Sequence, residues 1–135
     1  MAGRISRLLI ALFFAGAGVA HFVVPGRYVP IVPHVFPAPL VLVYVSGFFE
    51  ILGGVGLLVA RVRRAAGVGL ALLLVAVFPA NVQMLADAVR VNDPLWWRIF
   101  LVIRLPLQAA LIYWILRVTN NVTTSRQPAA TASTS

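Results

Sequence analysis

The chain has 135 residues, of which 61% are hydrophobic and 10% charged, and its net charge is +8. Soluble domains usually carry about 25% charged residues, so this composition predicts a membrane protein of one domain. The chain contains no cysteine, which excludes disulfides, thiol nucleophiles and thiolate metal sites.

The first apolar segment, residues 8–24, is predicted to be a membrane-spanning helix. It follows the basic residues Arg4 and Arg7 and is rich in small residues. It also resembles a signal peptide, with a candidate cleavage site at Gly18-Val19-Ala20. The apolar run continues beyond that site and three further spans follow, which favours retention of the segment.

A loop of five prolines is predicted next, over residues 25–39, because proline fixes the backbone and removes helix donors. Its Tyr28, His34 and Phe36 make the loop amphipathic. We expect it to lie at the membrane interface and to roof the outer half of the helices, since long loops in compact domains often act as lids.

The second span is predicted over residues 40–60, long enough to cross a bilayer, with Glu50 as its single charge. A charge at the centre of a span costs roughly 2.5 to 3.5 kcal/mol on insertion scales, so a partner is expected. Ser46, Glu50 and Gly54 share one helix face because they recur at intervals of four.

The third and fourth spans are predicted over residues 67–85 and 99–116, with kinks at Pro79 and Pro106. A polar connector over residues 87–97 contains the turn signal Asn92-Asp93-Pro94. The fold class is thus all-α, a four-helix transmembrane bundle over residues 1–118. Residues 119–135 are expected to form a disordered cytoplasmic tail.

The arginines predict the orientation of the bundle, because cytoplasmic loops carry the excess of basic residues. The side that holds the termini carries seven arginines: Arg4, Arg7, Arg61, Arg63, Arg64, Arg117 and Arg126. The other side carries three: Arg27, Arg90 and Arg98. Both termini are therefore expected in the cytoplasm. Anionic headgroups of the lipid bilayer suit these arginines better than nucleic acid does.

Polar residues inside the spans gather at one level, from the outer leaflet to mid-membrane. We predict that five of them bound a ligand site: His21, Glu50, Asn81, Arg104 and Gln108. Intramembrane ionisable groups are often functional.

Each of these residues also has a structural interpretation. Glu50 and Arg104 are predicted to form an ion pair between the second and fourth spans, although Arg104 has the alternative of reaching outward to phosphates. In the structural alternative, His21 is a helix-end residue that is hydrogen-bonded to the loop. In the structural alternative, Asn81 and Gln108 form hydrogen bonds with backbone groups that the prolines leave without partners. No metal site is predicted, because the two histidines lack further ligands.

Four stretches carry a family resemblance: AGVAHFVVPGRYVPIVPHVFP, LVYVSGFFEILGGVGLL, VAVFPANVQML and RLPLQAALIYWILR. Together they make the chain, over about residues 8–117, similar to the DoxX and DoxX-like family of small bacterial membrane proteins. The resemblance implies four helices in a bacterial inner membrane and a link to quinone-dependent oxidation or oxidative stress. It implies that a family site would fall at His21, Glu50, Asn81, Arg104 and Gln108.

Three functions remain open from the sequence. The first is binding of a small apolar carbonyl compound of the quinone type, or of a redox partner, in the outer half of the bundle. The second is a non-enzymatic subunit that anchors or stabilises a membrane redox complex. The third is a small permeant or proton pathway through Glu50. The sequence contains no cofactor motif and no signature of a stand-alone enzyme. Quinone is the ligand class that it favours. Whether the chain forms a homo-oligomer stays open.

Overall fold

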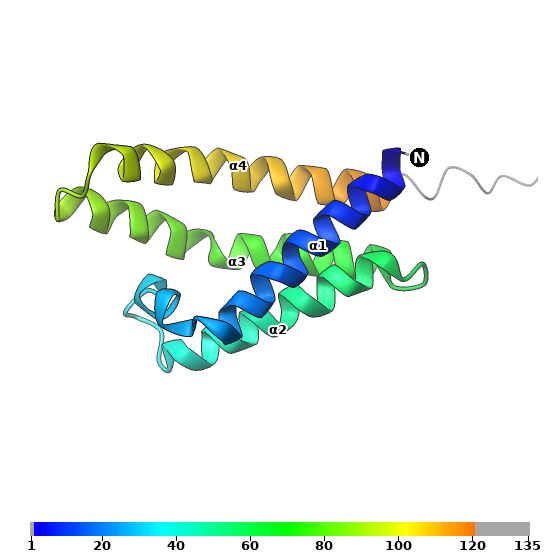
Figure 1. The fold of residues 1–135 in the computed structure, drawn as a ribbon, viewed down its shortest axis with the longest axis horizontal. Helices are drawn as coiled ribbons and strands as arrows, with labels where there is room; N and C mark the ends of the chain where they lie inside the picture. Colours follow the sequence, from blue (N-terminus) through cyan, green and yellow to red (C-terminus); the bar gives the residue numbers. More distant parts are fainter. Residues whose placement is uncertain (1, 121–135) are drawn as a thin grey trace, which may run out of the picture.

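The computed structural model describes residues 2–120, which form four α-helices and two short 3₁₀ helices with no strand among them (Figure 1). The α-helices are α1 (Ala2–Val23), α2 (Pro39–Leu58), α3 (Arg63–Arg90) and α4 (Leu95–Asn120). Each of the four is long and apolar enough to cross a membrane. The prediction of an all-α chain with four such helices is confirmed.

The helix ends differ from the predicted ones. α1, α3 and α4 extend farther at one or both ends because polar and arginine residues continue the helix beyond the apolar run. The predicted connector over 87–97 is therefore reduced to residues 91–94, where Asn92 has φ 55°, a left-handed conformation that asparagine tolerates. The chain remains helical through Pro79 and Pro106. The predicted tail begins inside α4, and its residues 121–135 lie outside the described part.

The helices pack mainly in chain order, α1 on α2, α2 on α3 and α3 on α4. In Figure 1, the start of α1, the α2–α3 turn and the end of α4 lie at one end of the bundle, and the 24–38 segment and the α3–α4 turn lie at the other. The buried core lies toward the first end, where α1 also meets α4. Its fully packed members are Ile10, Phe14, Leu57, Leu70 and Ile115.

Glycines bring α1 and α2 into close contact. A Cβ atom added at Gly18 would lie 2.5 Å from the carbonyl oxygen of Gly47, and one added at Gly47 would lie 2.6 Å from Cβ of His21. Small residues of this kind let the backbones of membrane helices approach closely. The close packing fixes the end of α1 against the middle of α2.

Many of the large apolar side chains point away from the bundle. Phe13, Leu72 and Leu107 are each at least 60% exposed. Such exposure would be costly in water, but it is ordinary where lipid tails are the solvent. The outer surfaces of the helices therefore fit contact with a lipid bilayer.

Candidate functional site

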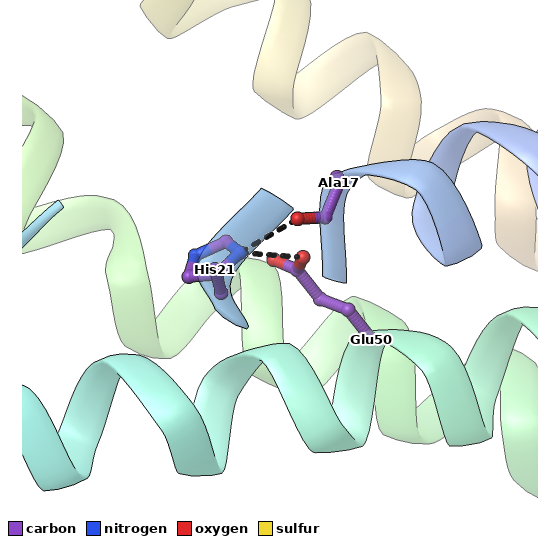
Figure 2. A network of polar contacts seen from close by, with 3 residues as sticks. All are labelled: Ala17, His21 and Glu50. Carbon is purple, nitrogen blue, oxygen red and sulfur yellow. Dashed lines mark hydrogen bonds and ion pairs between the residues drawn. The ribbon is translucent and has the colours of Figure 1, made fainter. Parts of the chain in front are cut away.

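His21 and Glu50 face each other where α1 meets α2 (Figure 2). Nδ1 of His21 lies 3.4 Å from Oε2 of Glu50, and each side chain is 12% exposed. The same Nδ1 lies 2.8 Å from the backbone carbonyl oxygen of Ala17. His21 reaches this position because it lies in the last turn of α1, directly over Gly47.

The hydrogen bonds leave one carboxylate oxygen without a donor. A backbone carbonyl only accepts, so Nδ1 of His21 carries the hydrogen and donates it to Ala17. Oε2 of Glu50 is buried and has no hydrogen-bond partner among residues 2–120. A buried polar atom without a partner costs free energy, so this oxygen is open to a hydrogen bond from a group outside residues 2–120.

Tyr28 covers the ring of His21. The two ring centroids are 4.0 Å apart and the planes are inclined by 24°. Two 3₁₀ helices, η1 (Pro25–Arg27) and η2 (Val29–Ile31), fold the chain back after α1 and bring Tyr28 onto His21. The sequence placed Tyr28 in an amphipathic interfacial loop and did not predict this contact, because the spacing of seven residues across a proline gives no fixed geometry.

Asn81 and Gln108 form a separate polar pair between α3 and α4. Nδ2 of Asn81 donates to Oε1 of Gln108 at 2.7 Å, and Nε2 of Gln108 donates to the carbonyl oxygen of Leu74 at 2.5 Å. Both side chains are buried, at 7% and 6% exposed. Each therefore has a partner within the bundle. Leu74 lies in the helical turn before Pro79, but the carbonyl that Pro79 leaves without its usual donor is that of Val75, four residues before the proline.

The predicted ion pair between Glu50 and Arg104 is wrong. Glu50 has its ionisable partner on α1, and Arg104 forms no ion pair among residues 2–120. The reason is the order of the helices, since α4 packs mainly on α3 and α2 packs mainly on α1 and α3. Two charges at a similar depth need not be neighbours in a bundle.

The loop after η2 reaches across to α3. Nε2 of Gln83 and Nδ1 of His34 lie 3.3 Å apart, and η2 also contacts α3. The segment from Pro25 to Ala38 thereby links the α1–α2 hairpin to α3 at the end of the bundle where His21 lies (Figure 1).

One family model matches the chain. The model described as "Domain of unknown function (DUF8561)" matches residues 10–119. The chain belongs to the DUF8561 family. No curated protein and no solved structure matches it.

The DUF8561 region contains both polar pairs, and they offer different chemistry. Asn81 and Gln108 are neutral and already bonded to each other, so they suit a structural role. His21 and Glu50 both bind protons and retain unused bonding capacity. Within residues 2–120 no three metal-binding side chains gather, so the His21–Glu50 pair has no third ligand for a metal.

Proposed function

We propose that this DUF8561 protein is a multi-pass protein of the bacterial inner membrane that binds a small apolar carbonyl compound of the quinone type beside His21 and Glu50. One observation carries the proposal, the buried Oε2 of Glu50 that has no donor among residues 2–120 and lies 3.4 Å from Nδ1 of His21. A ligand group beside this pair would supply the missing hydrogen bond.

The proton content of the pair matches the two forms of such a ligand. With His21 neutral and Glu50 ionised, Oε2 and the second ring nitrogen both accept, and they suit the hydroxyl groups of a hydroquinone. With one more proton on the pair, one of these atoms becomes a donor and suits the carbonyl of a quinone. The pair is therefore suited to binding either form, because its own protonation decides whether it accepts or donates the hydrogen bond.

Aromatic rings around the pair would favour a planar ligand. Tyr28 stacks on His21, and the rings of Phe22 and Tyr44 stack on each other at 5.3 Å with planes 5° apart. Ligand sites combine such apolar walls with a few fixed polar groups. The ligand would enter past the segment from Pro25 to Ala38, which acts as the roof of the site.

The resemblance to the DoxX family supports the quinone class and the bacterial inner membrane. The arginine distribution supports cytoplasmic termini, which would put the His21–Glu50 pair in the outer half of the membrane. Asn81 and Gln108 would hold α3 and α4 together, and Arg104, which forms no ion pair with Glu50, would lie outside the site. The proposed site thus contains fewer residues than the five that were predicted from the sequence.

A binding titration tests the proposal. The protein is placed in lipid nanodiscs and titrated with a short-chain ubiquinone analogue by calorimetry. His21→Phe retains a ring to stack on Tyr28 but removes both nitrogens. We expect this variant to bind about tenfold to a hundredfold more weakly, as the loss of a charge-assisted hydrogen bond would cause.

His34→Gln is the matched control, because it removes the other histidine, whose side chain is exposed, and keeps an amide that can hydrogen-bond Gln83. It should bind as the wild type does. Equal affinity of the wild type and both variants, or no binding by any of them, would contradict the proposal.

A further inference from the structure

An apolar groove runs along the outer face of the α2–α3 hairpin. Its volume is about 750 Å³, within the range of about 300 to 1,000 Å³ that is typical of ligand sites. Leu52, Gly56 and Val59 line it from α2 and the turn, and Ala65, Gly69 and Ala76 line it from α3. No charged residue lines it.

Small residues create the groove. Gly53 and Gly56 pack against Leu70 and Ala66, where an added Cβ would lie 2.5 Å and 2.7 Å from the opposing side chain. A Cβ added at Gly69, in contrast, would meet no atom within 4 Å. The helices are therefore in contact at the base of the groove, and Gly69 leaves space at its surface.

The groove has the dimensions of one acyl chain. Its α3 wall extends from Ala65 to Ala76, which at 1.5 Å per residue is about 17 Å. One leaflet contributes about 15 Å to the hydrocarbon thickness of a bilayer. Leu52, Leu72 and Val59 on its walls are 47% to 63% exposed, so the groove is open along its side to the surrounding lipid.

One end of the groove carries positive charge. Arg61 and Arg64 lie in and beside the α2–α3 turn, next to the lining residues Val62 and Ala65, and their side chains are exposed. Neither forms an ion pair among residues 2–120. Arg63 differs, because its Nε donates to the carbonyl oxygen of Leu57 and closes the end of α2.

No carboxylate competes for these two arginines. The three acidic residues of the chain are Glu50, Asp87 and Asp93. Glu50 lies beside His21 in the middle of α2, and Asp87 and Asp93 lie at the far end of α3. A phosphate placed at the turn would therefore meet only cationic side chains and the first N–H groups of α3.

We infer that the α2–α3 groove is a binding site for one anionic phospholipid, with an acyl chain between Gly56 and Gly69 and the headgroup phosphate on Arg61 and Arg64. The groove accounts for the acyl chain and the turn accounts for the negative charge. The site is separate from the His21–Glu50 pair, which lies on the α1 side of α2.

Native mass spectrometry of the detergent-purified protein with added phosphatidylglycerol or phosphatidylcholine tests this inference. The wild type should retain one phosphatidylglycerol in preference to phosphatidylcholine. Arg61→Gln with Arg64→Gln should weaken phosphatidylglycerol binding about 25-fold, or roughly fivefold for each arginine near a phosphate. Arg27→Gln with Arg90→Gln, at the other end of the bundle, is the control and should leave binding unchanged.

Gly69→Leu tests the acyl part of the site, because its Cβ would meet no atom within 4 Å and the rest of the side chain would occupy the groove that Gly69 lines. Gly16→Leu is its control, since a Cβ at Gly16 on α1 also meets nothing within 4 Å. Only Gly69→Leu should lose the bound lipid. Equal retention of both lipids by all variants would overturn the inference. So would a dimer that dissociates on Gly69→Leu while no lipid is bound, since a second copy would then occupy the groove.

Discussion

Nδ1 of His21 lies 3.4 Å from Oε2 of Glu50, across the interface of α1 and α2. This contact joins two side chains that are 29 positions apart in the chain and places an ionisable pair within two helices that are long and apolar enough to cross a membrane. It rests on the close approach of the two helices at Gly18 and Gly47. The proposed ligand site depends on this contact.

The two members of the pair should be energetically coupled. His21→Phe and Glu50→Gln should each lower the free energy of unfolding, and the double variant should lose less than the sum, by about 0.5 to 3 kcal/mol. Unfolding by a denaturing detergent, followed by circular dichroism, measures the cycle. Strictly additive losses would show that the pair does not interact.

Arg104 should behave as a residue independent of Glu50. Because no ion pair joins them, Arg104→Gln and Glu50→Gln should change the free energy of unfolding additively, within about 0.5 kcal/mol. The same detergent unfolding assay applies. A coupling energy as large as that between His21 and Glu50 would show that Glu50 and Arg104 do form an ion pair.

Gln108 should contribute stability and not ligand binding. Gln108→Leu leaves Asn81 without its acceptor in a buried site, which should cost about 1 to 3 kcal/mol of unfolding free energy. Asn81→Leu in the same chain removes the unpaired amide and should recover part of the loss. Quinone affinity of the folded variant should stay at the wild-type value. A loss of affinity without a loss of stability would place Gln108 in the ligand site.

Gly47 should tolerate no side chain. The Cβ atom of Gly47→Ala would meet Cβ of His21 and the carbonyl oxygen of Gly18 at 2.6 Å and 2.8 Å, so α1 and α2 must move apart. We expect a loss of about 1 to 3 kcal/mol, typical of overpacking. Gly16→Ala is the control and should be neutral or slightly stabilising, because its site is open. Equal thermal stability of the two variants would contradict the close packing.

The charge distribution predicts a cytoplasmic location for the end of α4. The start of α1, the α2–α3 turn and the end of α4 lie together and carry six of the described arginines: Arg4, Arg7, Arg61, Arg63, Arg64 and Arg117. Alkaline phosphatase fused after Arg117 should be inactive, and a fluorescent protein fused there should be bright. An active phosphatase would reverse the orientation.

The sequence was sufficient to predict the helices, because four long apolar runs separated by prolines and arginines leave few alternatives. It predicted that Glu50 needs a partner, but it could not identify which helix supplies that partner. Depth along a span can be counted in residues, whereas the neighbours of α2 depend on packing. Gly18 lies in a span rich in small residues, but its contact with Gly47 depends on how α1 packs on α2, which the sequence does not give. Tyr28 was missed because two 3₁₀ turns, and not a periodic pattern, carry it back to His21.

The ¹⁵N NMR spectrum of the His21 ring in the presence of a quinone tests most directly whether His21 and Glu50 form a ligand site. The chain has two histidines, so a His34→Gln background leaves His21 as the single labelled imidazole. Addition of a short-chain ubiquinone analogue to the protein in nanodiscs should shift the ring ¹⁵N resonances of His21, with a midpoint equal to the calorimetric dissociation constant. Unchanged resonances at saturating quinone would contradict a ligand site at His21 and Glu50.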